Sequence, residues 1–101
     1  MKTIYDLIPV FDSRKSFYGK AKVIIMESGE IILQSYDTFV ASIKDRKVTI
    51  KGFYSTTTLR HIKEFLKQNG FEVGSKKELE KLYMQWVLNA LYKAIKLIIA
   101  L

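Results

Sequence analysis

The last twenty residues of the chain are apolar on most sides of the helix that they predict. Residues 82–101 contain no glycine or proline, and their polar residues Gln85, Asn89, Lys93 and Lys96 recur at spacings of four, four and three. These spacings place all four on one narrow stripe of an α-helix. A surface helix of a small domain hides only one face, so the sequence predicts that a partner covers the remainder.

Five residues of this helix are the candidates for that contact: Leu88, Tyr92, Ile95, Ile99 and Trp86. Tryptophan and tyrosine are frequent anchors of protein interfaces, whereas the alternative is that these side chains fill the core of their own chain. The partner would be another copy of the chain, a host protein or a membrane surface.

Length and composition predict one globular domain over residues 1–101. Hydrophobic residues make up 49% and charged residues 27%, and the absence of cysteine excludes disulfides and thiolate metal sites. The net charge of +7 favours an acidic partner such as nucleic acid, anionic lipid or an acidic protein face. Solubility alone explains the same charge equally well.

Neither end of the chain predicts a secretory signal or a membrane span. Asp6, Pro9 and Asp12 interrupt any apolar segment near the start, and Lys93 and Lys96 oppose insertion of the last helix into a bilayer. We therefore expect a cytoplasmic protein of the host cell. Peripheral attachment to a membrane through the last helix is a further alternative.

The residue pattern predicts an α+β fold, in which an antiparallel meander of three to four strands precedes two helices. Residues 1–19 are expected to be irregular, with one helical turn near residues 4–8. Alternating and β-branched residues predict the sheet over 20–54. Helices are expected over 55–70 and 75–101, the second long and apolar.

Local sequence patterns predict two of the turns of the sheet and the facing of one of its strands. Ser28-Gly29 and Asp45-Arg46 are typical of tight turns between strands. The alternation of Phe39, Ala41 and Ile43 predicts that these three side chains share one face of a strand.

Capping residues mark the ends of both predicted helices. Ser55 and the threonines after it are N-cap candidates, and Gly70 is the expected left-handed residue after the first helix, with Phe71 folding back on its last turn. Ser75 and Glu78 form a capping box that predicts the start of the second helix.

Basic residues of the first helix are candidates for binding an anion or nucleic acid. Arg60, Lys63 and Lys67 share one helix face, which would suit a nucleic-acid backbone or, alternatively, an ordinary solvated face with an Arg60–Glu64 pair. Arg60 and His61 also follow free helix N-terminal amides that could hold a phosphate or carboxylate. Capping alone explains those residues more simply.

A second basic candidate lies near the start of the chain. Arg14 and Lys15 precede Phe17 and Tyr18, a mixture that suits stacking on a single strand. A strand edge guarded by lysines has the same composition.

No pattern in the chain predicts catalysis, a metal site or a cofactor. His61 is the only histidine, cysteine is absent, and no carboxylate cluster has ligand spacing. No nucleophile elbow or glycine-rich phosphate loop is present. We therefore expect a protein that is not an enzyme.

The segments SYDTFVA, at residues 35–41, and YSTTTLRHIKEFLKQNG, at residues 54–70, resemble a small uncharacterised domain family. That family is associated with phages and mobile elements of low-GC Gram-positive bacteria, and its pattern is SYxTxVA followed by YSxTTxRHIxEFLxQxG. The resemblance implies a phage or mobile-element accessory protein that acts by protein–protein binding, for example by inhibiting a host factor such as a defence nuclease. The alternatives are a basic nucleic-acid-binding accessory protein and a peripheral membrane protein.

Overall fold

The computed structural model describes residues 2–51, 55–72 and 76–99, without the side chains of residues 76, 82, 83 and 86. The elements are β1 (Thr3–Asp6), β2 (Ala21–Ile25), β3 (Ile31–Ser35), β4 (Thr38–Lys44), β5 (Lys47–Ile50), α1 (Thr56–Gln68) and α2 (Lys76–Ile99). The described strands form one antiparallel sheet in the order β1-β2-β3-β4-β5. The α+β class with helices after the sheet is confirmed, but the sheet has five strands rather than three or four.

The additional strand is β1, which lies in the segment expected to be irregular with one helical turn. Thr3 pairs with Ile25 and Asp6 with Lys22, and the Lys22 Nζ lies 2.7 Å from the Asp6 carboxylate. All four residues of β1 are exposed, because it is an edge strand with an open face on both sides. Its sequence therefore shows no alternation of buried and exposed side chains, and only its pairing with β2 identifies it as a strand.

The predicted turns are present and use left-handed backbone conformations. Gly29 has a φ of 89°, and Asp45 and Arg46 have φ values of 50° and 63°. Two successive residues with positive φ are typical of the type I′ turn, whose twist matches that of the flanking strands. Arginine is a poor residue for this conformation, because its Cβ crowds the backbone.

Replacing Arg46 by glycine is expected to raise the free energy of unfolding by about 0.5–1 kcal/mol, because glycine adopts positive φ without that crowding. Urea denaturation checks the change. Lys44→Gly, at an exposed position within β4, is the control and should be destabilising. A loss of stability in Arg46→Gly would contradict the assigned turn.

A β-bulge in β4 changes the alternation predicted for Phe39, Ala41 and Ile43. Leu33 pairs with Ala41, but the next residue of β3 pairs with Phe39, so Val40 is the additional residue. Val40 and Ala41 are both buried, whereas Phe39 is 48% exposed. A bulge adds one residue to the strand and so breaks the two-residue alternation of side chains between the faces of the sheet. For this reason Phe39 does not share a face with Ala41.

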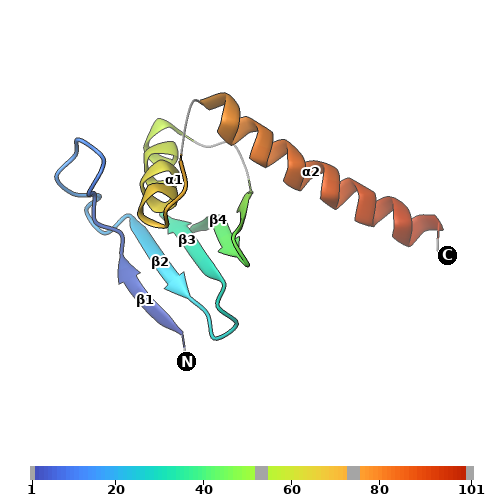
Figure 1. The fold of residues 1–101 in the computed structure, drawn as a ribbon, viewed down its shortest axis with the longest axis horizontal. Coiled ribbons are helices and arrows are strands. Elements are labelled where there is room, and N and C mark those ends of the chain that lie inside the picture. Colours follow the sequence, from blue (N-terminus) through green and yellow to red (C-terminus); the bar gives the residue numbers. More distant parts are fainter. Residues whose placement is uncertain (1, 52–54, 73–75, 100–101) are drawn as a thin grey trace.

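Helix α1 packs on one face of the sheet (Figure 1). Ser55 is its N-cap, and the Ser55 Oγ accepts a hydrogen bond from the Thr58 backbone N–H at 3.3 Å. At the other end Gly70 has a φ of 84°, and the Phe71 N–H donates to the Leu66 carbonyl. The Gly70 and Phe71 geometry is a Schellman motif and confirms the predicted end of the helix, and the Ser55 cap confirms its predicted start. The core beneath α1 contains Val23, Leu33, Ala41, Ile50, Ile62, Phe65 and Leu66.

Substituting Gly70 by alanine is expected to lower the free energy of unfolding by about 1 kcal/mol. A Cβ at this position meets no atom within 4 Å, so the cost comes only from the left-handed backbone. Thermal denaturation of Gly70→Ala and Gly70→Asn tests whether the left-handed backbone causes the loss of stability. Asparagine tolerates that conformation better than alanine, so Gly70→Asn should lose less. Equal losses in both variants would argue against backbone strain.

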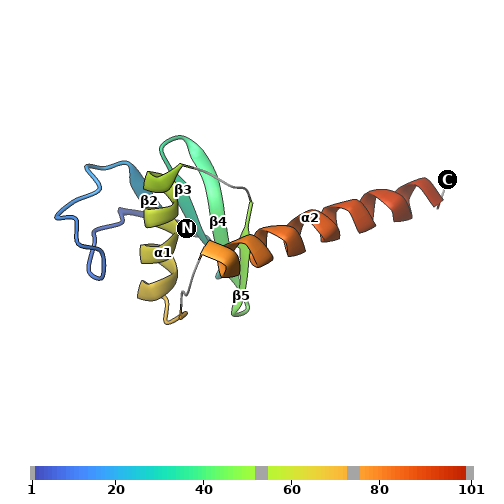
Figure 2. The same cartoon turned by 90° about the horizontal axis from the view of Figure 1, so that it is seen from above.

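Helix α2 begins against the body of the protein and then projects away from it (Figures 1 and 2). It contacts β5, and Leu79 near its start is 2% exposed and joins the core. Its 24 residues span about 36 Å, so most of the helix extends beyond the sheet. The predicted capping box involves Ser75, which lies outside the described residues.

Candidate functional site: a basic groove and an exposed apolar helix

A buried carboxylate on α1 holds the loop that follows β1. The Glu64 side chain accepts backbone hydrogen bonds from Val10 at 3.0 Å, Phe11 at 3.0 Å and Asp12 at 2.8 Å, and one from the Gln68 side-chain amide. Glu64 is 1% exposed. Burial raises the pKa of its carboxyl group, but these hydrogen bonds outweigh that effect, and the pKa lies below its ordinary value.

The same loop places an acidic residue beside Arg60. The Arg60 guanidinium lies 3.1 Å from the Asp12 carboxylate, which also accepts a hydrogen bond from the Arg14 backbone N–H. The alternative considered from the sequence was an ion pair between Arg60 and Glu64. Glu64 instead binds the loop, and that loop brings Asp12 to Arg60.

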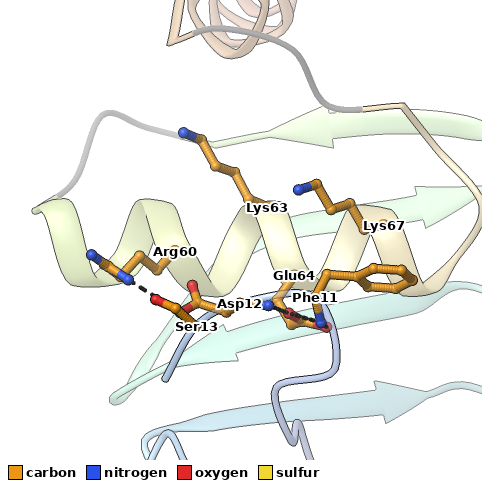
Figure 3. Close-up of a pocket in the computed structure, with 7 residues that line it drawn as sticks. All are labelled: Phe11, Asp12, Ser13, Arg60, Lys63, Glu64 and Lys67. Carbon is orange, nitrogen blue, oxygen red and sulfur yellow. Dashed lines mark hydrogen bonds and ion pairs between the residues drawn. The ribbon is translucent and has the colours of Figure 1, made fainter. Parts of the chain in front are cut away.

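A cavity of about 180 Å³ lies between the loop and α1. It is lined by Phe11, Asp12, Ser13, Arg60, Lys63, Glu64 and Lys67 (Figure 3). A second cavity of about 400 Å³ shares Asp12, Arg60 and Lys63 with the first and reaches Leu79 at the start of α2. We call these two cavities together the basic groove.

Three of the predicted contact residues therefore come together at the basic groove. Lys63 and Lys67 extend to the same side of α1 (Figure 3), and neither forms an ion pair with another described residue. Arg60 is partly neutralised by Asp12. The groove is lined by three basic and two acidic side chains, since Glu64 contributes a carboxylate as well as Asp12, and it therefore carries a net charge of +1 next to the Phe11 side chain, which is 58% exposed.

His61 does not lie on this surface, although the sequence placed it among the contact residues. It is 1% exposed, and its Nδ1 lies 2.8 Å from the Ser35 Oγ, which is in turn 3.0 Å from the Thr58 Oγ1. The Phe17 ring packs edge-on at 4.6 Å between centroids. Burial lowers the pKa of the His61 imidazole, and the Asp12 carboxylate opposes this only in part.

The other predicted basic residues, Arg14 and Lys15, are exposed on the loop but line neither cavity of the basic groove. The aromatic residues expected beside them separate, since Phe17 is buried against His61 while Tyr18 is 77% exposed. The stacking surface suggested by the sequence therefore lacks one of its two rings.

Helix α2 carries the second candidate surface. Leu88, Tyr92, Ile95 and Ile99 are all more than half exposed, and Leu91 on the same part of the helix is 54% exposed. The side chain of Trp86 lies outside the described residues. The structure thus leaves four of the five predicted contact residues uncovered by their own chain, and their role in an interface stays a prediction.

Two negative findings apply to the described ranges. Residues 2–51, 55–72 and 76–99 contain no cluster of three His, Cys, Asp or Glu side chains suited to a metal ion. Neither helix in those ranges combines the length and hydropathy that a membrane span requires.

Glu64 is the residue of this region that sequence reasoning missed. Its carboxylate looked like one member of a solvated charge pattern on α1. A buried acid among apolar helix positions is a weak signal by itself, and its partners here are backbone amides more than 50 residues away.

Comparison with known proteins identifies a family and no individual relative. Neither the search of curated proteins nor the search of solved structures gave a match. A family model matches residues 5–81, which include the second half of β1, β2 to β5, α1, the basic groove and the first turns of α2. Because that match covers most of the chain, the protein belongs to the family of unknown function DUF8033.

Proposed function

We propose that this chain is a non-enzymatic accessory protein of a phage or mobile element that acts by protein–protein binding through α2. The observation that carries the proposal is the exposed apolar surface of α2, which includes Leu88, Leu91 and Ile95. Contiguous apolar patches on soluble proteins usually mark interaction sites. The phage context, and inhibition of a host factor such as a nuclease, follow from the sequence resemblance alone.

Burying a whole leucine or isoleucine side chain yields about 1.5–3 kcal/mol, so covering a half-exposed one yields about 1 kcal/mol. Leu88, Leu91 and Ile95 are each between 53% and 59% exposed. Several such side chains on one projecting helix give a protein partner enough favourable free energy to offset part of the cost of association.

A pair of matched variants tests the proposal. Leu91→Glu and Asn89→Glu each add one negative charge at an exposed position of α2, but only the first lies on its apolar side. Each full-length protein is immobilised and exposed to lysate of a bacterium that carries the gene, and captured proteins are then purified and titrated. We expect a partner that binds the wild type and Asn89→Glu and loses affinity for Leu91→Glu. Equal capture by all three proteins would contradict the role of α2.

Nucleic-acid binding is a second candidate function, favoured by one observation. Lys63 and Lys67 line the basic groove without ion pairs to described residues, and Arg14 and Lys15 are exposed on the loop beside it. Phosphate contacts of this kind give affinities that fall steeply with salt.

This second candidate is tested by titrating single-stranded DNA and RNA at two salt concentrations. The double variant Lys63→Gln/Lys67→Gln should bind more weakly and with a shallower salt dependence than the wild type. Lys44→Gln/Lys47→Gln is the control, because it removes the same charge from the exposed β4–β5 hairpin. Absence of binding by the wild type at low salt would exclude this function.

A further inference from the structure

We infer that α2 pairs antiparallel with α2 of a second copy of the chain, using a seam formed by Met84, Leu88, Leu91, Ile95 and Ile98. The inference rests on the proposed role of α2 in protein binding and names the partner. All five seam side chains are at least half exposed. They lie on the part of α2 that projects beyond the body, where a second helix can reach them (Figures 1 and 2).

The spacing of the seam residues is that of a coiled coil. Successive members are separated by four, three, four and three residues, which is the alternation of a and d positions in a heptad repeat. This places Leu88 and Ile95 at a, with Met84, Leu91 and Ile98 at d. The surface is self-complementary, since leucine and isoleucine at these positions interlock with the same residues of an identical helix.

Positions beside the seam are apolar as well. Tyr92 and Ile99 occupy e positions and Val87 and Ala94 occupy g positions, while Gln85, at the first e position, is the polar but uncharged exception. Over residues 84–99 the apolar residues occupy an arc of roughly 220° of the helix circumference. A single partner helix covers much less than this, so we expect two antiparallel pairs to stack as a four-helix bundle.

A second copy fits this surface better than an unrelated protein. The exposed arc is present on every molecule as soon as it is made, and an identical chain is the partner that is always available at the same concentration. The two lysines of the distal helix, Lys93 and Lys96, lie on the polar side, so they remain in solvent when the seams of two copies meet.

Charge complementarity indicates the antiparallel orientation. Lys77 and Lys81 continue the seam toward the start of α2, where they line an open surface depression of about 480 Å³ together with Glu80, Met84, Gln85 and Leu88, so that the lining has a net charge of +1. Parallel helices would bring these lysines of two copies together. Antiparallel helices instead place the last turn of the partner's α2, with its exposed carbonyl groups and partial negative charge, beside Lys77 and Lys81.

The antiparallel pairing defines a register. Because a positions face d positions between antiparallel helices, Leu88 lies opposite Leu91 of the other copy and Met84 lies opposite Ile95. Lys81 then meets Ile98 at the end of the seam, where its aliphatic stem covers the isoleucine while its ammonium group reaches the partner's last carbonyls.

Molar mass in solution tests the self-association. Light scattering on the full chain at micromolar concentration should give at least twice 11.7 kDa for the wild type and for Asn89→Glu. Leu91→Glu should move toward 11.7 kDa, with a dissociation constant raised about a hundredfold, because the pairing buries the new carboxylate of both copies. Circular dichroism verifies that the variant folds. A wild-type mass of 11.7 kDa overturns the inference.

Cysteine cross-linking tests the orientation without background, because the chain has no cysteine. Met84→Cys and Ile95→Cys proteins are oxidised separately and after mixing in reducing buffer. An antiparallel pair gives disulfide-linked dimers only in the mixture, since equal positions are about 16 Å apart along the helix. Dimers formed by each variant alone indicate parallel helices and overturn the proposed pairing.

The two proposals fail in different ways. A monomeric wild type that captures a host protein through Leu91 contradicts self-pairing and leaves the proposed function intact. A wild-type oligomer that depends on Leu91 and captures no other protein supports self-pairing and contradicts action on a host factor.

Discussion

Replacing Glu64 by alanine should lower the free energy of unfolding by about 3 kcal/mol. The substitution removes the acceptor for the backbone N–H groups of Val10, Phe11 and Asp12, and a buried donor that loses its partner costs about 1–3 kcal/mol. Part of this loss is recovered, because Val10 and Phe11 are largely exposed and water reaches their backbone. Urea denaturation measures the change.

Glu64→Gln is the matched comparison. Glutamine keeps the size of the side chain but has one carbonyl oxygen in place of two carboxylate oxygens, so an intermediate loss of about 1–2 kcal/mol is expected. In both variants, hydrogen exchange should accelerate at the amides of Val10, Phe11 and Asp12 before it does so in the sheet. Unchanged exchange at these amides would show that Glu64 does not hold the loop.

The second large effect concerns His61, whose replacement by alanine should cost about 3 kcal/mol. The imidazole is 1% exposed, packs against Phe17 and hydrogen-bonds Ser35, so its removal leaves a cavity under α1 and an unpaired hydroxyl. Thermal and urea denaturation measure the loss. Arg60→Ala, the neighbouring position at the surface, should cost less than 1 kcal/mol because it removes only a partly exposed ion pair.

Acid should weaken the fold in two separate pH ranges. The pKa of His61 is lowered from 6.5, so its unfolded form binds a proton first, and stability is lost as pH falls from 6.5 toward the folded pKa. The pKa of Glu64 is lowered from 4.5, and its contribution is lost in the same manner as pH falls below that value. Measuring the free energy of unfolding as a function of pH checks the predicted direction of both effects. His61→Gln should abolish only the loss of stability in the higher pH range, which is due to His61.

The ends and turns of the elements follow from the sequence because they depend on residues a few positions apart. Ser55 caps α1 through the amide three residues later, and Gly70 ends it through bonds within the last turn. The turn at Asp45-Arg46 is likewise local. The apolar character of α2 is also a property of its own residues, and two of the contact residues predicted from it, Leu88 and Ile95, belong to the seam that we assign to a second copy.

Tertiary structure alone decided β1, the bulge at Val40 and the positions of Glu64 and His61. Asp12 is 52 residues from Glu64 and 48 from Arg60, and Ser35 is 26 from His61. No local pattern specifies that Glu64, the single acidic residue of α1, will meet a distant loop rather than solvent. The amphipathic pattern of α1 gives the face that is buried, but the atoms that satisfy each buried polar group are chosen only when sheet, loop and helix pack together.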